Sequence, residues 1–345
     1  MCKICTNEYN EIDLKIIIQN CDKIKTIPNN LINLEFLEIK NCKNLLNISN
    51  NLINLKKLFI SNCELLENLP LEIYKIEHLR IDNCQKFKYI NTNYINLKCL
   101  QIIYCNLINI IPKQLINLNE LFIIDCFNIN ILPIELINLN TLCLYNCFSI
   151  SNIPLEYINL ERLEILYNNN ISNISNNFIK LNHLELIACN NITSLPRSLV
   201  NIKYICLYKC NNIYYIPLEY NNLEIIHISK CNNIDEIFIK LINIGLLDMS
   251  EDGDLELTII HNSYTISKYI ALQYIKYFYV NGKKKRKLLK LNLQKYYYYI
   301  LDDYFCPSSK YIQYFADNID DIDDSPRRIA YLNNNNELKI LNIKK

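Results

Sequence analysis

The sequence predicts a repeat solenoid followed by a C-terminal segment of different character. Three observations predict this fold class: one residue type recurs every 21 positions, apolar residues recur at fixed offsets from it, and the pattern ends near residue 252. Periods of about 20 to 50 residues are typical of solenoids, in which each repeat packs on its neighbours. The 345-residue chain is therefore expected to form one repeat array with a tail.

Cysteine marks the repeat, because it occupies positions that are multiples of 21. We call these the ladder positions, and cysteine stands at Cys21, Cys42, Cys63, Cys84, Cys105, Cys126, Cys147, Cys189, Cys210 and Cys231. Asn168 and Asp252 fill the two gaps in the series. About twelve units of 21 residues thus span residues 13–252, which leaves 1–12 as an N-terminal cap and 253–345 as a C-terminal cap or tail.

Apolar residues recur around each ladder position. They lie eight, five and three residues before it, as Leu118, Leu121 and Ile123 do before Cys126, and three and six residues after it. Proline often stands seven residues after it, at Pro28, Pro70, Pro112, Pro133, Pro154, Pro196 and Pro217. The unit therefore reads LxxLxIxxCxxIxxIPxxLIN.

This unit resembles the leucine-rich repeat, whose signature is LxxLxLxx(N/C)xL. The resemblance implies an α/β horseshoe-shaped solenoid, in which each LxI segment is a strand and successive strands pair in parallel along a concave face. It also implies a short, irregular convex side, where we expect one helical or 3₁₀ turn beginning at the proline. The abundance of Asn, Ile, Lys and Tyr is similar to that of leucine-rich-repeat proteins of giant DNA viruses of amoebae, which would make the partner a host protein. The same residues have A/T-rich codons, so we attribute their abundance to genome composition.

The ladder residues are expected to point into the interior of the array. Equivalent residues stack about 4.8 Å apart, so a chain of disulfides or a file of metal ions is one interpretation. Parallel Cβ vectors do not converge on one sulfur–sulfur bond, however, and Asn168 cannot form a disulfide although it can make the same inward hydrogen bonds. We therefore predict a buried structural ladder formed by Cys42, Cys63, Cys84, Cys105, Cys126, Cys147, Asn168, Cys189, Cys210 and Cys231.

No enzyme, cofactor or metal site is predicted. Cys2 and Cys5 resemble the opening of a RING-type zinc finger, but no further Cys or His precedes Cys21, and a zinc site needs four ligands. Three histidines fall on the expected concave face in separate coils, with no nucleophile or carboxylate pair evidently converging on any of them: His78, His183 and His227. The 3 glycines cannot build a phosphate-binding loop.

The residues that flank the buried strand positions should face the concave side. Two residues before the ladder, the first four units carry polar or charged residues, whereas units five to ten carry only apolar residues or tyrosine. Such a centre with a polar rim is typical of a protein-binding surface. The expected partner-binding residues are Ile103, Tyr104, Phe122, Ile124, Tyr145, Leu166, Tyr167, Ile187 and Tyr208. The alternative is that β propensity and codon usage alone place Ile and Tyr on strands.

The tail carries 15 basic and 10 acidic residues over 253–345. Its segment 265–280 has helical spacing of apolar residues, so we predict a small, mainly helical domain that caps the last coil. Five consecutive basic residues, Lys283–Lys287, form a solvated turn in this interpretation. They could instead form a nucleic-acid or nuclear-import patch.

The predicted function is that of a non-enzymatic protein-interaction scaffold. One alternative is the substrate receptor of a ubiquitin-ligase complex, a role that the resemblance implies, and another is nucleic-acid binding through the basic tail. Overall charge is nearly balanced, with 36 basic and 35 acidic residues, so the whole molecule should not attract nucleic acid or membrane. The sequence lacks a signal-peptide pattern and any apolar run of about 18 residues, so an intracellular, cytoplasmic location without membrane contact is expected, or a nuclear one if Lys283–Lys287 direct import.

Overall fold

A computed structural model gives the structure of the chain. It describes residues 4–6, 8–10, 12–214, 216–217, 219–220, 222–223 and 225–231, and the backbone of the strands between 247 and 343. The chain divides into two units, Met1–Ile192 and Thr193–Lys345, which we treat separately.

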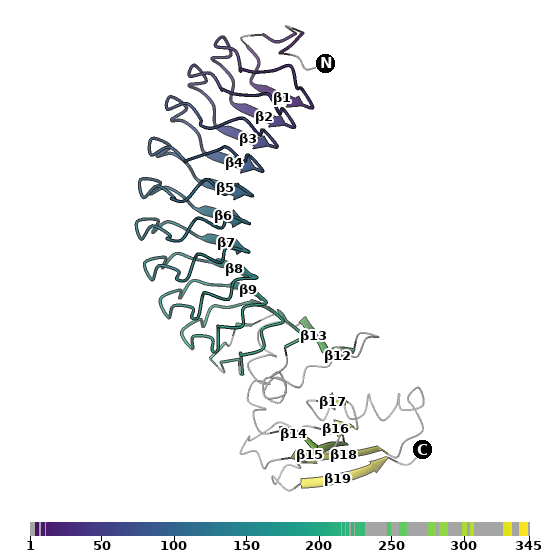
Figure 1. Ribbon diagram of the computed structural model, residues 1–345. Coiled ribbons are helices and arrows are strands. Elements are labelled where there is room, and N and C mark those ends of the chain that lie inside the picture. Colours follow the sequence, from purple (N-terminus) through teal and green to yellow (C-terminus); the bar gives the residue numbers. More distant parts are fainter. Residues whose placement is uncertain are drawn as a thin grey trace. The chain divides into compact units, whose positions relative to one another are not determined.

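The described part of the first unit is a parallel-strand solenoid with one short strand in each coil (Figure 1). Each strand pairs in parallel with the strand of the next coil at an offset of 21 residues, as Lys15 pairs with Phe36. The strands lie on the inner side of the arc that this unit forms. They are β1 (Lys15–Gln19), β2 (Phe36–Lys40), β3 (Lys57–Ser61), β4 (His78–Asp82), β5 (Cys99–Ile103), β6 (Glu120–Ile124), β7 (Thr141–Tyr145), β8 (Arg162–Leu166) and β9 (His183–Ile187).

The core follows from the alternation of side chains along each strand. The second and fourth residues point into the coil and are buried, as Leu121 and Ile123 are in β6, whereas Phe122 and Ile124 face outward and are half-buried. The apolar residues at the other fixed offsets fill the same interior, so each coil contributes one layer to a continuous core.

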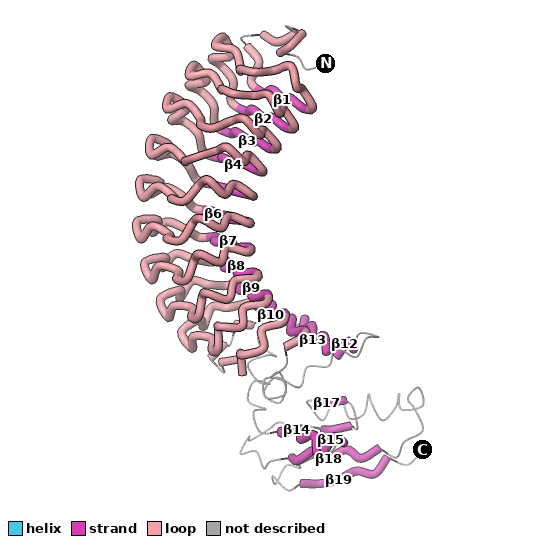
Figure 2. Tube along the Cα trace, viewed as in Figure 1, coloured by secondary structure: helices cyan, strands magenta, loops and turns pink. Residues whose placement is uncertain are grey.

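The convex side consists of hydrogen-bonded turns rather than helices (Figure 2). In the coil that follows β5, the carbonyl of Pro112 accepts a hydrogen bond from the backbone N–H of Leu115 at 3.2 Å, and the carbonyl of Leu115 accepts one from Leu118 at 3.0 Å. The expected turn therefore begins at the proline, but it does not extend into a helix in any described coil. Three fully buried tyrosines connect this side to the preceding coil, because each hydroxyl donates a hydrogen bond to a proline carbonyl there. The pairs are Tyr94 with Pro70, Tyr157 with Pro133 and Tyr220 with Pro196.

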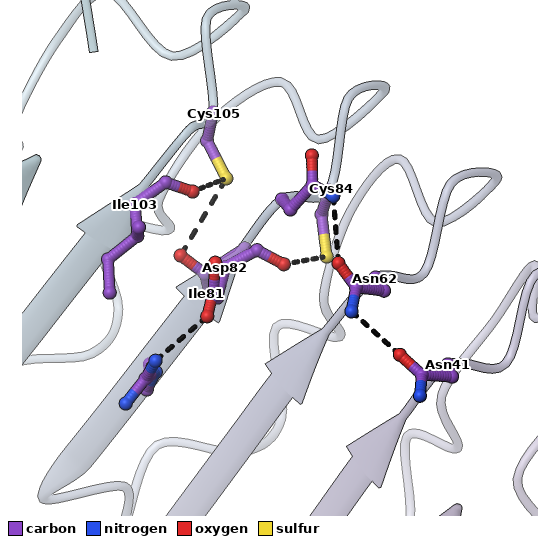
Figure 3. A network of polar contacts seen from close by, with 9 residues as sticks. Asn41, Asn62, Ile81, Asp82, Cys84, Ile103 and Cys105 are labelled. Carbon is purple, nitrogen blue, oxygen red and sulfur yellow. Dashed lines mark hydrogen bonds and ion pairs between the residues drawn. The ribbon is translucent and has the colours of Figure 1, made fainter. Parts of the chain in front are cut away.

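The ladder residues join consecutive coils through hydrogen bonds to the backbone (Figure 3). The Cys105 thiol donates to the carbonyl of Ile103 in its own coil, at 3.2 Å, and faces the carbonyl of Ile81 in the preceding coil, at 3.7 Å. Cys126, Cys147 and Cys189 repeat both contacts in their own coils. The described cysteines between residues 5 and 231 form no disulfide bond.

Asn168 occupies the same interior site with stronger hydrogen-bonding groups. Its side-chain amide donates to the carbonyls of Cys147 at 2.7 Å and Ile150 at 3.1 Å in the preceding coil. Its oxygen accepts the backbone N–H groups of Asn170 at 2.9 Å and Ile171 at 3.2 Å. The asparagine thus makes four hydrogen bonds to the backbone, and the N–H of Ile171 that it binds is buried.

A second column lies one residue before the ladder, where the chain turns inward. In every coil from Asn20 to Lys230 this residue has a positive φ, between 50° and 55°. Asparagine tolerates this left-handed conformation better than most residues. In the first coils the asparagine side chains also bond to one another, as Asn62 does to Asn41 at 2.6 Å (Figure 3). Asparagine therefore has a structural role in this column, which codon usage alone does not explain.

The second unit continues the repeat for two coils. Strands β10 (Tyr204–Tyr208) and β11 (Ile225–Ser229) pair in parallel. The strand β13 (Leu255–Ile260) then pairs antiparallel with β11, and β12 (Leu247–Met249) pairs antiparallel with β13. The twelfth repeat was expected to place its strand, β12, in parallel beside β11, but β13 occupies that position. Asp252 at the ladder position gives a reason, because an interior site there would have to bury a carboxylate.

Farther along, the described residues form three antiparallel pairs, namely β14 (Ile275–Val280) with β15 (Lys283–Leu288), β16 (Tyr299–Leu301) with β17 (Tyr304–Cys306), and β18 (Arg327–Leu332) with β19 (Leu338–Ile343). The predicted helix is thus wrong over 275–280, and its remainder, 265–274, lies outside the described residues. The basic run Lys283–Lys287 lies in β15 and not in a turn. The sequence signal is Asn281–Gly282 between two strand-forming segments, a strong hairpin pattern. The described residues include no helix that could span a membrane.

Replacing Asn168 by alanine should destabilise the array more than replacing it by cysteine. Alanine removes four hydrogen bonds and leaves the buried N–H of Ile171 without this acceptor. An unsatisfied buried group costs about 1–3 kcal/mol, so we expect a loss of about 2 kcal/mol or more. Cysteine keeps a donor, as the neighbouring coils do. Urea denaturation of the two variants, followed by circular dichroism, measures the difference. Equal losses would contradict the bonding role of this side chain.

Candidate functional site

Five of the predicted partner-binding residues form one continuous row on the concave face of the first unit. Consecutive members are register partners across strands β5 to β9, and each side chain is half-buried and faces outward. The row consists of Ile103, Ile124, Tyr145, Leu166 and Ile187. Phe122 lies on β6 in the adjacent outward position, and Tyr208 lies in the second unit, at the end of β10.

Tyr104 and Tyr167 do not lie on strands. They occupy the left-handed column, with φ angles of 50° and 54°, and their side chains are 49% and 41% exposed. A bulky residue in this conformation is unusual, and the left-handed region costs an ordinary residue about 1–2 kcal/mol. The sequence therefore places exposed tyrosines at two positions where asparagine would fit the backbone better. Interaction with the Asp125 carboxylate, which favours the protonated phenol, raises the pKa of Tyr104.

The structure brings Tyr145 and Tyr167 together beside a shallow pocket. Their ring centroids are 5.5 Å apart in an edge-to-face arrangement. The pocket has a volume of about 290 Å³ and is lined by Tyr145, Asn146, Phe148, Tyr167, Asn169 and Ala188. Ala188 belongs to the left-handed column, so a small side chain stands where other coils have asparagine, lysine or tyrosine. We refer to these six residues as the aromatic pocket.

Phe148 is a member of this pocket that the sequence analysis missed. It follows the ladder residue Cys147 directly, and it stacks on Phe127 of the preceding coil with centroids 6.0 Å apart and planes at 9°. Both rings are exposed. The sequence does contain a signal for this residue, because phenylalanine follows two consecutive ladder cysteines, Cys126 and Cys147. The position directly after the ladder is not one of those that flank the buried strand residues, so it was not predicted to face a partner.

The outward positions of β8 and β9 carry a cluster of charged side chains. His183 Nε2 lies 3.9 Å from Glu164 Oε1 and 3.9 Å from Glu185 Oε2. Arg162 Nε donates to Glu164 Oε1 at 2.6 Å. The expectation that no carboxylate pair converges on a histidine is therefore wrong for His183. It failed because the 21-residue register brings side chains from neighbouring coils together, which a single coil does not reveal.

Exposed apolar side chains are not confined to the concave face. Another column lies ten residues before each ladder position, ahead of the strand, and about half of each of its residues is exposed. It consists of Ile32, Ile53, Tyr74, Ile95, Ile116, Ile137, Ile158, Ile179 and Val200. This column is uniform from coil to coil. The concave row differs because it is polar in β1 to β4, apolar in β5 to β9, and bordered by the aromatic pocket.

Three ladder thiols in the middle of the array are poorly reactive. Burial raises the pKa of Cys105 and Cys147 to about 12 and that of Cys126 to about 11, so these thiols stay protonated and poorly nucleophilic near neutral pH. The Cys5 and Cys21 sulfurs lie 3.3 Å apart, and Cys2 lies outside the described residues. The thiols therefore contribute to packing along most of the array.

Comparisons with solved structures give partial matches at low identity. No protein-family model and no curated protein matches the sequence. The leucine-rich repeat domain of the type III effector XopL is 17% identical, with a TM-score of 0.41, over 59% of this chain and 71% of that chain. The plant peptide hormone receptor RGFR1, in complex with RGF2, is 14% identical with a TM-score of 0.25, over 64% and 65%. PEPR1, in complex with AtPEP1, is 14% identical with a TM-score of 0.24, over 62% and 55%.

The free energy of unfolding should fall as the pH rises from 8 to 10. Burial raises the pKa of Cys105, Cys126 and Cys147, so the folded state holds these protons more tightly than the unfolded chain, in which thiols ionise near a pH of about 8.5. The stabilisation is complete below that pH and is lost above it. We expect a decrease of about 2 kcal/mol or more, measured by urea denaturation under reducing conditions. A flat profile over this range would contradict the buried, protonated ladder.

Replacing Tyr104 by asparagine should stabilise the array by about 1 kcal/mol, because asparagine accepts the left-handed backbone at lower cost. Replacing it by valine should destabilise, since a β-branched residue fits this conformation poorly. Tyr89→Asn is the matched control: Tyr89 is 51% exposed but is absent from the left-handed column. Urea midpoints rank the three variants, and an equal gain from Tyr89→Asn would show that the backbone is not the cause.

Proposed function

We propose that this chain is a non-enzymatic scaffold that binds a protein partner on the concave face of its first unit. The observation that carries the proposal is the placement of Tyr104 and Tyr167 in the left-handed column. At both positions the repeat gives up the residue that its backbone prefers and exposes a tyrosine beside the apolar row. Backbone strain of this kind is typical of functional sites.

The composition of the surface supports the same proposal. Tyrosine and phenylalanine supply large contact areas with few rotatable bonds and dominate binding energy at protein interfaces. The apolar row has polar groups at one end and along one flank. Arg80 and Asp82, whose ion pair measures 2.8 Å, lie on β4 before the row begins, and the charged cluster lies beside its last two members on β8 and β9. Such a rim excludes water from the centre of an interface and sets the orientation of the partner.

The aromatic pocket defines the chemistry of the partner more closely. Its volume of about 290 Å³ suits one apolar or aromatic side chain, and Asn146 and Asn169 offer amide groups for the backbone of the same segment. We infer a protein partner that inserts one such side chain. The proposal includes that the partner is a host protein and that the chain acts in the cytoplasm. Substrate recognition for a ubiquitin ligase and nucleic-acid binding through Lys283–Lys287 stay predictions from the sequence.

The double variant Tyr145→Ala with Tyr167→Asn should weaken partner binding by more than about tenfold, because it removes the two rings that form the pocket wall. The full-length chain is used to capture partners from cell lysate, and the purified partner is then titrated against each variant by calorimetry. Asparagine at position 167 fits the local backbone, so the fold should survive.

The matched control is Ile137→Ala with Ile158→Ala. These two isoleucines lie in the same part of the array and are each 50% exposed, but they belong to the column ahead of the strands. The proposal requires that this control binds the partner as the unchanged chain does. If the control loses binding and the tyrosine variant keeps it, the partner occupies the other face and the concave assignment is wrong.

A further inference from the structure

Three side chains on adjacent strands bring ligand-type atoms to one point of the concave face. They are Glu164 on β8 and His183 and Glu185 on β9. One carboxylate oxygen from each glutamate and one imidazole nitrogen lie within 4.8 Å of one another. All three side chains are largely shielded, with 15%, 18% and 24% of Glu164, His183 and Glu185 exposed.

The register of the sheet produces this convergence. Glu164 is the register partner of Glu185, and Arg162 is the partner of His183. Residues two apart on one strand face the same side, so His183 and Glu185 both point outward from β9, and Glu164 points outward beside them from β8 in the preceding coil. Strand backbones hold the three side chains, and sites built on strands are more rigid than sites built on loops.

The charge balance of this cluster favours a cation. Two carboxylates lie on one shielded surface, and Arg162 supplies one compensating charge through its hydrogen bond to Glu164.

We propose that Glu164, His183 and Glu185 bind one divalent transition-metal ion, for which zinc is the best chemical match. Imidazole nitrogen and carboxylate oxygen are standard zinc ligands, at about 2.0–2.2 Å from the metal. Magnesium and calcium prefer oxygen ligands alone, so the imidazole selects against them.

The distances in the cluster suit this assignment. Ligands of a tetrahedral zinc ion lie about 3.4 Å from one another, and the histidine nitrogen is 3.9 Å from each carboxylate oxygen. Small side-chain rotations close the difference. Arg162 orients the Glu164 carboxylate, as outer contacts do in metal sites. Three protein ligands leave one coordination position for water or for a donor group from outside the chain.

Zinc binding by the reduced full-length chain tests the proposal, in competition with a chromophoric zinc indicator. The unchanged chain should bind zinc in the micromolar range or tighter, and excess magnesium should not displace it. Glu185→Gln, which preserves shape, should weaken this site by more than about tenfold. His183→Ala should remove one equivalent of zinc. His78→Ala is the matched control, because His78 occupies the same position in the repeat on β4.

The melting temperature provides a second measurement. Zinc should raise it for the unchanged chain and for His78→Ala, but by less for His183→Ala and Glu185→Gln, since a ligand stabilises only a chain that retains its site. The proposal is overturned if the unchanged chain binds no zinc, or if both site variants retain the full stoichiometry and affinity, which would place the metal on cysteine thiols. Partner binding to the aromatic pocket is measured with other residues, so the two proposals fail independently.

Discussion

The contact between the ladder side chains from Cys105 to Cys189 and the backbone of the preceding coil is the constraint on which the array depends. A coil of 21 residues leaves no room for a helix, so the interior contains backbone groups that no regular helix satisfies. A cysteine thiol faces one of these carbonyls in the preceding coil, and Asn168 binds two. Because these contacts repeat at a fixed offset, every strand stays in register with the next, and every outward side chain has a defined neighbour.

Asparagine performs a different task at each of several positions in the repeat. At the ladder it satisfies buried backbone groups, and one residue earlier it accepts a left-handed backbone. Nine residues before the ladder its side chain donates to a carbonyl of the preceding coil, as Asn96 does to Tyr74 and Asn138 to Ile116, both at 2.9 Å. The abundance of this residue therefore has a physical function in the fold, whatever the codon usage of the gene.

The repeat, the strands and the buried positions could be predicted from the sequence because each depends on one coil alone. A period of 21 and an LxI segment are sufficient to place Leu121 inside and Ile124 outside. The sequence of one coil does not show that Tyr145 and Tyr167 share a pocket or that two glutamates converge on His183, since both arrangements join side chains from neighbouring coils. The tail was misjudged over 275–280 for a different reason: spacing of apolar residues was given more weight than the Asn–Gly turn that separates two strand-forming segments.

The left-handed residue at the end of each strand also affects how such an array can change through evolution. The coil fixes the backbone at this point, and in most coils the side chain does not enter the core. A substitution there carries a conformational cost of about 1–2 kcal/mol but disturbs no packing in neighbouring coils. Each coil therefore has one position at which a new exposed side chain can be acquired, tested against a changing partner and exchanged again for asparagine. Tyr104, Tyr167 and Ala188 show that the same backbone conformation accommodates side chains of very different size.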